Sequence, residues 1–455
     1  MKLQQVINQK WLFKKMNKYT TIIGLEIHIE PNTKSKMFCS CSQNHFGAKP
    51  NSQTCPICLG LPGALPIANK EAINKTIKLG LALGSKISET SRFYRKHYFY
   101  PDLPKSFQTS QKENPFCIGG ELLGFKINHI HLEEDAGKLL HETVNGERVS
   151  LVDFNRSGCA LIEMVTEPVF HSVQDVIRFT KELQLISKYL DISGADMEKG
   201  TMRLEANISL SREIPNDKSQ ITNLPNYKVE LKNINSFRFL EKALIAEIER
   251  QTEALDNGEE LIQETRGYDE NTKKTFSQRT KADSHDYRYF PEADLPPVKP
   301  AECQMPNAKC QMPELPEQKR KRFEEQYKLS NDYINILVSD ITRANYFEEA
   351  VKLSPDLVKS IADLMINKNL DKDFPEPAGL VRKLKEITNV EYASNEELQN
   401  AINEVISKNL DIVESYKNGK GQVVGFLIGQ VQKILSGKGD PKLISAKLIQ
   451  QLNAN

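Results

Sequence analysis

The sequence predicts an α+β protein, with an antiparallel sheet domain first and all-helical domains after it. Apolar and polar residues alternate in several segments of residues 20–294, as in strands with one buried and one polar face. Helical patterns lie between these segments. From residue 295 the alternation stops, which predicts a helical middle domain (295–388) and a helical tail (389–455). A short extension (1–19) precedes the sheet domain.

The strand-like segments carry titratable side chains on their polar faces. Because successive residues of a strand point to opposite sides, Glu26 and His28 share one face of the first strand. Four strands together contribute Glu26, His28, Glu163, Glu167, Arg203, Glu205, Asn207, Lys228, Glu230 and Lys232. A solvated face explains any one such strand, but several of them suggest the floor of an active site.

Two helices within the sheet domain have recognisable starts. Ser172 is a predicted N-cap for a helix to Leu190, with Asp175 in a position like that of a capping box. Ser236 can start a second helix that runs toward Gly258. The apolar residues of the first helix recur at helical spacing, so one side of it should face inward.

Two close cysteine pairs predict a zinc site. Cys39-x-Cys41 and Cys55-x-x-Cys58 flank a short loop rich in glycine and proline, and each pair can share one ion. Four thiolates leave no open coordination position, so the zinc would be structural and would brace the strand that carries Glu26. The alternative is a mobile loop with free cysteines.

Acidic and basic residues together favour phosphate chemistry. The segment HLEEDAGK (131–138) ends a strand in a carboxylate cluster, and oxygen ligands with one imidazole suit magnesium or manganese. Paired acids alone could instead form a hydrolase dyad. The counter-charges that a triphosphate needs are present as Arg92, Arg95, Lys96, Lys105, Arg203 and Lys232. Residues 96–105 mix aromatic and basic side chains, as at a stacking or terminal-nucleotide site, although an edge strand and turn would look the same.

Composition limits the compartment and the partners. The net charge is +1, so any contact with nucleic acid must be local. No run is long enough to span a membrane, and eight cysteines, four of them clustered, fit a reducing compartment. The first twenty residues are basic without acids, like a weak transit peptide, but a start at Met16 is the simpler explanation. We therefore expect a cytoplasmic protein, or an organellar one if the extension is a targeting segment.

The tail combines lysines with regularly spaced glycines. Gly421, Gly425 and Gly429 recur every fourth residue, a pattern that usually lets helices approach closely. Local basic character comes from Lys417, Lys420, Lys433, Lys438 and Lys442. A plain helical packing module and a surface for nucleic-acid phosphates both fit this pattern.

Nine ordered motifs resemble one family. GLEIHIE, the CxC…CPxC loop, RKHYFYPDLPKSFQTSQ, HLEEDAGK, VDFNRSGCALIEMVTEP, MRLEANISL, ELKNINSF, DYRYFPEADLPP and YKNGKGQVVGFLIGQ are similar to those of the B subunit of aspartyl/glutamyl-tRNA(Asn/Gln) amidotransferase, the GatB family. The resemblance covers about residues 20–294 and 389–455, and the extension departs from the family pattern.

The resemblance implies a glutamine synthetase-like cradle, a helical domain and a helical tail that touches tRNA. The implied activity is that of an ATP-dependent carbon–nitrogen ligase with glutamine as nitrogen donor. ATP phosphorylates the side-chain carboxylate of glutamate or aspartate mischarged on tRNA(Gln) or tRNA(Asn). Ammonia from an amidase, the A subunit, then displaces phosphate, in a heterotrimer completed by a small C subunit.

Motif by motif, the resemblance also implies site residues. The residues that match its metal site, for magnesium, are Glu26, His28, Glu134 and Glu163, with Glu133 and Asp135 as further or substitute ligands. Strand alternation, more than the family, places Arg203, Asn207 and Lys232 near the phosphates. We predict a catalytic set of Glu26, His28, Glu134, Glu163, Arg203 and Lys232, and nucleotide contacts from Lys96, Lys105 and Asn207.

Two other functions compete. A zinc-stabilised adaptor could dock tRNA without catalysis, but an adaptor needs cations and aromatics, not a cluster of carboxylates with histidine. A free-standing carboxylate–amine ligase would need its own ammonia source, and no amidase-like nucleophile is recognisable. The preference between Glu-tRNA(Gln) and Asp-tRNA(Asn) cannot be read from the sequence.

Overall fold

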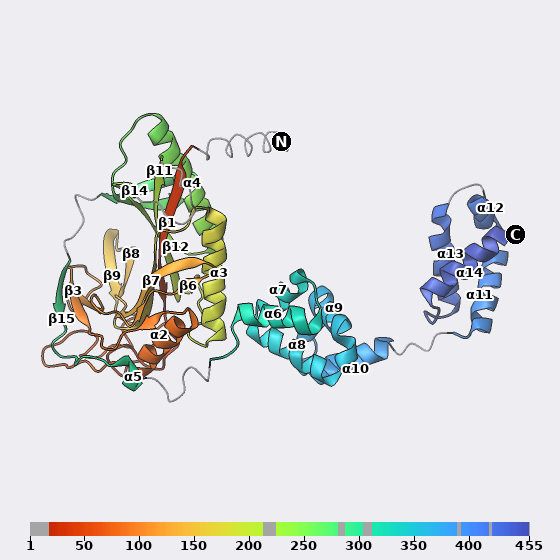
Figure 1. Ribbon diagram of the computed structural model, residues 1–455, viewed down its shortest axis with the longest axis horizontal. Coiled ribbons are helices and arrows are strands. Elements are labelled where there is room, and N and C mark those ends of the chain that lie inside the picture. The colour runs from red at the N-terminus through yellow and green to blue at the C-terminus, as the bar shows by residue number, and fades with distance from the viewer. Residues whose placement is uncertain are drawn as a thin grey trace. The chain divides into compact units, whose positions relative to one another are not determined.

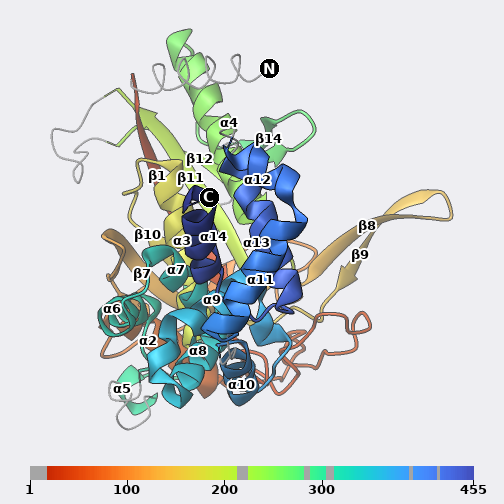
Figure 2. The ribbon, with the colours of Figure 1, turned by 90° about the vertical axis from the view of Figure 1, so that its right-hand side faces the viewer.

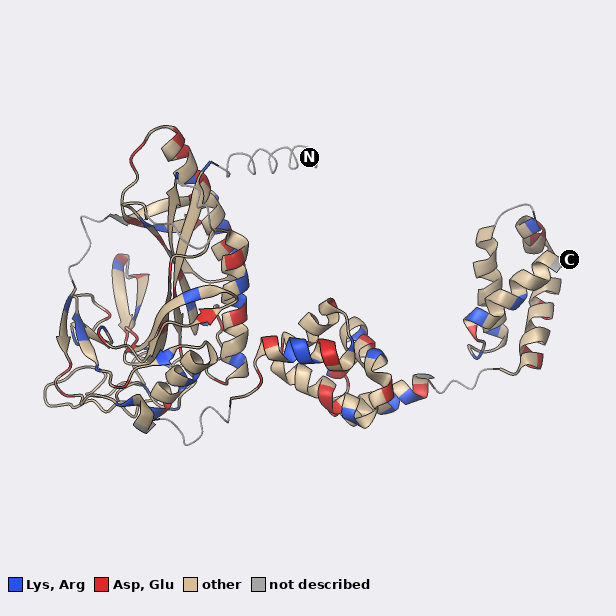
Figure 3. Cartoon of the chain, viewed as in Figure 1, with Lys and Arg blue, Asp and Glu red and all other residues tan. Residues whose placement is uncertain are grey.

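The computed structural model describes residues 18–212, 224–280, 287–303, 312–388, 393–417 and 421–454. The chain divides into two compact units, Met1–Glu325 and Gln326–Asn455 (Figure 1). Acidic and basic side chains are interspersed in both units (Figure 3). Most of the predicted extension, up to residue 17, lies outside the described residues.

A large sheet dominates the first unit. Its ten described strands follow the order β14-β13-β12-β11-β1-β10-β7-β5-β2, with β6 paired to β7. They are β1 (Thr20–Ile29), β2 (Lys86–Ile87), β5 (Cys117–Ile118), β6 (Glu121–Leu122), β7 (Phe125–Glu134), β10 (Ala160–Thr166), β11 (Met202–Ser211), β12 (Val229–Ile234), β13 (Glu264–Asp269) and β14 (Lys274–Thr280). An α+β fold is therefore confirmed, with the sheet central to it.

The sheet is mixed, so the prediction of a purely antiparallel sheet is wrong in one place. β12 and β13 pair in parallel, whereas the other described pairs are antiparallel. The helix α4 (Phe237–Asp256) lies between them in the chain. Parallel neighbours need such a crossover connection, because a tight turn can only reverse the chain direction.

Helices cover the apolar face of the sheet. α2 (Lys70–Ala82), α3 (Val173–Tyr189) and α4 contribute buried side chains to one core with the inward residues of the strands. Figure 1 shows α3 and α4 against the same side of the sheet. Both predicted caps are confirmed: Ser172 accepts from the backbone N–H of Asp175, and Ser236 from that of Phe239. These helices leave the opposite, polar face of the sheet uncovered, and the candidate functional site lies on that face.

Two smaller sheets complete the unit. β15 (Arg288–Pro291), β3 (Tyr94–His97) and β4 (Phe107–Ser110) form a three-stranded sheet. β8 (Lys138–Val144) and β9 (Glu147–Asp153) form a hairpin that projects from the large sheet (Figure 2).

Apart from one isolated β-bridge between Val298 and Ser91, the regular elements of the described chain after residue 295 are helices, as predicted. These are α5 (Pro300–Cys303), α6 (Pro316–Tyr327), α7 (Asn331–Val338), α8 (Ile341–Leu353), α9 (Val358–Lys368), α10 (Pro377–Thr388), α11 (Asn395–Lys408), α12 (Leu410–Lys417), α13 (Val424–Ile434) and α14 (Pro441–Ala454), with short 3₁₀ turns between some of them. Among the described residues, no helix is both long and apolar enough to cross a membrane.

The helices α11 to α14 share a core of their own, formed by buried residues from Leu398 to Leu452. Lys433 on α13, Lys442 on α14 and Lys438 in the connection between them are exposed, and Lys420 lies outside the described residues. The predicted role of the tail glycines is wrong for this unit. A Cβ built on Gly421, Gly425 or Gly429 would have no heavy atom within 4 Å, so they do not mark a close helix contact.

Candidate functional site

One row of polar side chains crosses four neighbouring strands of the large sheet. His131 on β7 is opposite Glu163 on β10, which is opposite His28 on β1, which is opposite Arg203 on β11. Directly opposite residues on one face lie within side-chain reach of each other. The register alone therefore assembles two imidazoles, a carboxylate and a guanidinium.

Two imidazoles and two carboxylates form a closed ring within this row. The Oε2 atom of Glu163 lies 3.3 Å from Nε2 of His28 and 3.3 Å from Nε2 of His131. Glu133, two residues after His131, closes the ring. Its Oε1 is 3.7 Å from Nε2 of His28, and its Oε2 is 3.6 Å from Nε2 of His131. We call these four residues the imidazole–carboxylate ring.

A second acidic cluster lies next to the ring on the same face. Carboxylate oxygens of Glu26, Glu205 and Glu230 approach to within 4.8 Å of one another. Lys232 contacts two of them, with Nζ 2.9 Å from Glu205 and 3.3 Å from Glu230. Asn207 donates to Oε1 of Glu26 at 2.8 Å. The polar face thus holds two neighbouring groups of hard oxygen ligands.

The shifted pKa values of the side chains on this face reflect several carboxylates held close together. Burial raises the pKa of Glu26, and the charges of Glu163 and Glu205 raise it further. Burial alone would raise the pKa of Glu163, but the imidazoles of His131 and His28 hold it well below its usual range. Burial would lower the pKa of His131, but the carboxylates of Glu163 and Glu133 raise it to about 10. A cation placed here would be attracted by several buried carboxylates.

Basic side chains border the acids. Arg203 donates to Oδ2 of Asp135 at 2.7 Å. Burial would raise the pKa of Asp135, but Arg156 and Arg203 keep it below its usual value. Lys96, on β3 of the small sheet, faces the same carboxylates. Burial would lower its pKa, but Glu133, with other neighbours, raises it.

Tyrosines surround the Lys96 ammonium. Its Nζ lies 4.8 Å from the ring centre of Tyr287 and 6.0 Å from that of Tyr98. The two tyrosine rings pack edge to face, with centroids 5.6 Å apart. An aromatic and cationic wall therefore stands opposite the acidic face, which agrees with the mixed character expected of residues 96–105.

Unpaired polar atoms on the face suit a hard cation and an anionic ligand. In the described part of the chain, His131 Nδ1, Arg203 Nε and Asn207 Oδ1 are buried without a hydrogen-bond partner. Buried polar atoms usually have partners, so three orphans on one face suggest that a ligand supplies them. The donor set of His28, Glu133 and Glu163, whose ligand atoms lie within 4.8 Å of one another, fits a magnesium or manganese ion.

The four predicted zinc ligands do come together. The Sγ atoms of Cys39, Cys41, Cys55 and Cys58 all lie within 4.8 Å of one another, and those of Cys55 and Cys58 are 3.8 Å apart. A tetrahedral site with Zn–S bonds of about 2.3 Å has sulfur–sulfur edges of about 3.8 Å. The hydrogen bond between Cys39 and Cys58 lowers the pKa of Cys58 to about 5 and raises the pKa of Cys39, so the two thiols share a proton that a zinc ion would displace. The residues therefore fit a zinc ion.

A buried lysine and a glutamine attach this cysteine loop to the sheet. Nζ of Lys36 donates to the backbone oxygens of Gln53 (2.9 Å) and Ser157 (2.8 Å) and lies 3.9 Å from Sγ of Cys58. Gln43 exchanges two hydrogen bonds with the backbone of Ala160, the first residue of β10. The loop is thus tied to the strand that carries Glu163.

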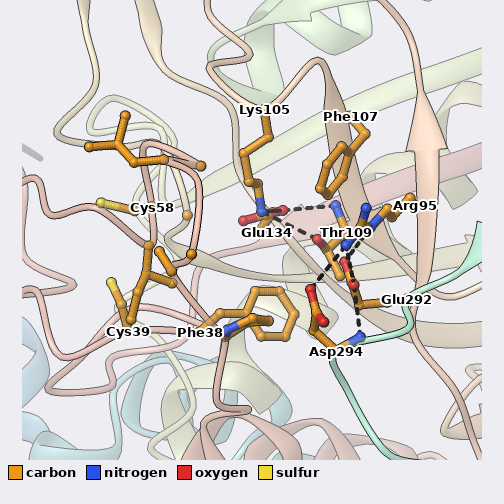
Figure 4. A pocket seen from close by; sticks show the side chains of 17 residues that line it. Phe38, Cys39, Cys58, Arg95, Lys105, Phe107, Thr109, Glu134, Glu292 and Asp294 are labelled. Carbon is orange, nitrogen blue, oxygen red and sulfur yellow. Dashed lines mark hydrogen bonds and ion pairs between the residues drawn. The ribbon is translucent and has the colours of Figure 1, made fainter.

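The structure does not bring Glu134 into the predicted metal set. Glu134 points to the opposite side of β7 from Glu133, because consecutive strand residues alternate. It is bonded to the Lys105 ammonium and, at 2.8 Å, to the backbone N–H of Thr109. Figure 4 shows Lys105 and Glu134 pointing toward each other in a pocket that Cys39 and Cys58 also line. Lys105, predicted to contact nucleotide, thus bonds Glu134 in this pocket and, within the described part of the chain, forms no hydrogen bond or ion pair with the imidazole–carboxylate ring.

The other predicted residues divide between two places. The polar face collects Glu26, His28, Glu163, Arg203, Asn207 and Lys232, with Lys96 opposite. Arg95 instead pairs with Glu292 and Asp294 beside the Lys105 pocket, and Arg92 is exposed. Sequence reasoning did not single out His131 as a site residue, although its two-residue spacing from Glu133 was a usable signal.

Fold and site define a class: an α+β protein whose sheet carries a buried face of carboxylates and imidazoles suited to hard cations. Comparison with known families makes this specific. A family described as the GatB/GatE catalytic domain matches residues 21–305, and one described as the GatB domain matches residues 324–452. The chain therefore belongs to the GatB family, the B subunits of tRNA-dependent amidotransferases.

Relatives align with this chain over nearly its whole length. The B subunit of the aspartyl/glutamyl-tRNA(Asn/Gln) amidotransferase of Thermodesulfovibrio yellowstonii is 40% identical, over 95% of this chain and 99% of the relative. The B subunits of the same name from Clostridium beijerinckii and Thermosipho melanesiensis are each 41% identical. These alignments cover 96% and 93% of this chain, and 99% and 97% of the relatives. The resemblance noted from the motifs is confirmed.

Proposed function

We propose that the chain is the kinase and transamidase subunit of a glutamine-dependent tRNA amidotransferase. Its substrates would be Glu-tRNA(Gln), Asp-tRNA(Asn) or both, and its products the correctly amidated tRNAs used in translation. The observation that carries this proposal is the imidazole–carboxylate ring, flanked by Arg203 and Lys232 on its own sheet face and faced by Lys96 from the small sheet. Such a face offers ligands for a hard cation together with positive charge for phosphates.

The proposed reaction has two balanced steps. A side-chain carboxylate oxygen of the mischarged amino acid attacks the γ-phosphorus of ATP, and ADP leaves. Ammonia then attacks the resulting acyl phosphate, phosphate leaves, and the nitrogen loses one proton. Activation is needed because a free carboxylate is a poor acyl donor, whereas phosphate is a good leaving group.

Each part of the face has a role in this scheme. His28, Glu133 and Glu163 would hold magnesium, and Glu26 with Glu205 and Glu230 would lie beside it as a further oxygen cluster. A bound magnesium ion supplies charge neutralisation at the phosphates. Arg203, Lys232 and Lys96 would offset the remaining negative charge, and Asn207 would orient Glu26 through its 2.8 Å hydrogen bond.

The zinc loop would have a structural role. Zinc on Cys39, Cys41, Cys55 and Cys58 would fix a loop that has little regular structure of its own. Through Gln43 this loop meets the start of β10, and through Lys36 the turn before it. The metal would thereby support the strand that carries Glu163 without taking part in chemistry.

The implied partners are an amidase, the A subunit, which releases ammonia from glutamine, a small C subunit, and the mischarged tRNA. The exposed lysines of α13 and α14 would contact tRNA phosphates. We expect the complex to work in the cytoplasm, or in an organelle if residues 1–19 act as a targeting segment.

Amidation by the reconstituted complex tests this proposal. Wild-type complex, ATP and glutamine should amidate at least one of the two mischarged tRNAs, and the rate with each tRNA decides the substrate. The competing function is a zinc-stabilised tRNA adaptor without catalysis. A complex in which His28→Gln amidates at the wild-type rate would favour the adaptor.

A further inference from the structure

His131 occupies the inner corner of the imidazole–carboxylate ring. Its ring is buried, with a side-chain exposure of 8%, whereas that of His28 is 16%. Both contacts of its Nε2 are to carboxylates, at 3.3 Å to Glu163 and 3.6 Å to Glu133. Ionised carboxylates only accept hydrogen bonds, so an Nε2–H at this corner can donate to Glu163, with Glu133 as the more distant partner.

The opposite edge of the His131 ring has no such partner. Its Nδ1 is buried without a hydrogen bond to any described residue. The ring of His129 stacks against it, with centroids 5.2 Å apart and planes 24° apart. Among the described residues, the polar contacts of the imidazole therefore run only to the two carboxylates.

These contacts set the carboxylate orientations. Glu133 directs Oε2 to His131 and Oε1 toward His28, while Glu163 directs Oε2 to both imidazoles. A carboxylate with one oxygen tied to an N–H donor has a restricted rotation, so its ligand atoms are already placed when a cation arrives.

We propose that His131 is a positioning residue that holds Glu133 and Glu163 in place for a divalent cation bound by these carboxylates and His28. The inference rests on the proposed function, since it deepens the cation site. It assigns the two histidines of the ring different tasks. The imidazole of His28 faces the same two acids but is the more exposed of the two, and its Nε2 would exchange its proton for the ion, whereas His131 would keep its N–H and act through the two acids.

Manganese is the probe for the test, because it accepts the same hard ligands as magnesium and is paramagnetic. Mn²⁺ affinity of the purified complex is measured by electron paramagnetic resonance for wild type, His131→Met and His131→Gln. His131→Met replaces the imidazole with an apolar side chain of similar size that has no N–H donor. His131→Gln retains an N–H that can reach the carboxylates.

We expect His131→Met to weaken Mn²⁺ binding about 10- to 100-fold, as is usual when a partner of a metal ligand is removed. His131→Gln should recover most of the affinity. His129→Gln, which alters the stacked neighbour but none of the ring contacts, is the matched control and should bind like wild type. If His131→Met does not fold, His131→Ala replaces it in the same comparison.

The nitrogen coupling to bound Mn²⁺, measured by electron spin echo spectroscopy, separates positioning from direct ligation. The coupling should persist in His131→Gln and disappear in His28→Gln. Wild-type Mn²⁺ affinity in His131→Met, or in His131→Ala where it replaces that variant, would overturn the inference while leaving the proposed function standing. Loss of the nitrogen coupling in His131→Gln would overturn it too, by making His131 a ligand. If wild-type complex binds no Mn²⁺, the cation site of the proposed function fails and the inference fails with it.

Discussion

Replacing Glu133 with glutamine should impair cation binding, whereas the same change at Glu134 should not. The two residues are adjacent, both buried, and chemically identical, but they face opposite sides of β7. Glu133 lies within 3.7 Å of both imidazoles of the ring. Glu134 instead contacts Lys105 and the backbone of Thr109. The pair therefore forms a matched experiment within one strand.

The expected size follows from the ligand set. His28, Glu133 and Glu163 offer a divalent ion two negative charges, and Glu133→Gln removes one of them without a large change in volume. At an effective dielectric constant near 20, a unit charge about 4 Å from a divalent ion is attracted to it by roughly 8 kcal/mol, twice the value for two unit charges. Desolvation offsets part of this, so a net loss of about 3 kcal/mol is reasonable. That corresponds to a roughly 100-fold weaker cation affinity.

The assay is Mn²⁺ titration of the reconstituted complex, followed by amidation of mischarged tRNA at saturating magnesium. Glu133→Gln should lose about 100-fold in affinity and amidate poorly, while the partner continues to hydrolyse glutamine. Glu134→Gln should bind Mn²⁺ like wild type, whatever its effect on amidation through Lys105. Equal losses of affinity in the two variants, or a loss only in Glu134→Gln, would refute the assignment of faces.

Three further predictions concern other parts of the chain. Purified protein should contain about one zinc per chain, and the double change Cys55→Ser with Cys58→Ser should remove it and lower the melting temperature. Retained zinc would contradict the four-thiolate site. Burial would raise the pKa of Glu292, but Arg95 holds it below the ordinary value. The ion pair therefore contributes its full stabilisation above about pH 4.3, the pKa of glutamate in an unfolded chain. This stabilisation is lost as the pH falls through the lower pKa that Glu292 has in the folded protein. Glu292→Gln should therefore reduce the fall of the melting temperature with decreasing pH on the acid side. An unchanged dependence of melting temperature on pH would contradict a stabilising Arg95–Glu292 pair. Deletion of 389–455 should weaken tRNA binding and reduce its salt dependence while glutamine hydrolysis persists; unchanged tRNA affinity across a salt series would exclude the tail as a contact, and loss of the complex would make it structural.

Local periodicity was sufficient to predict the strands and to place many of the side chains on the polar face of the sheet. The two-residue repeat is a property of each segment alone, so Glu26, His28 and Glu163 could be placed on polar faces without knowing the sheet. The two helix caps were equally local, since Ser172 and Ser236 bond backbone groups three residues away.

Pairing between distant strands could not be read in the same way. Which of the two adjacent acids, Glu133 or Glu134, joins His28 depends on how β7 sits beside β10, and the sequence of β7 does not state this. The same holds for the parallel β12–β13 pair, because a strand pattern has no direction. His131 was not predicted as a site residue, because a single histidine indicates a site only once the strand pairing that puts Glu163 opposite it is known.

The central claim is that this chain transfers phosphate to the carboxylate of a mischarged aminoacyl-tRNA. Hydroxylamine intercepts acyl phosphates, so the direct measurement is formation of side-chain hydroxamate on Glu-tRNA(Gln) or Asp-tRNA(Asn) with ATP and magnesium but without glutamine. We expect hydroxamate and a matching amount of ADP with wild-type complex, and neither product with Glu163→Gln. Hydroxamate absent from wild-type complex on both tRNAs, with tRNA still bound tightly, would contradict the claim and identify the chain as an adaptor.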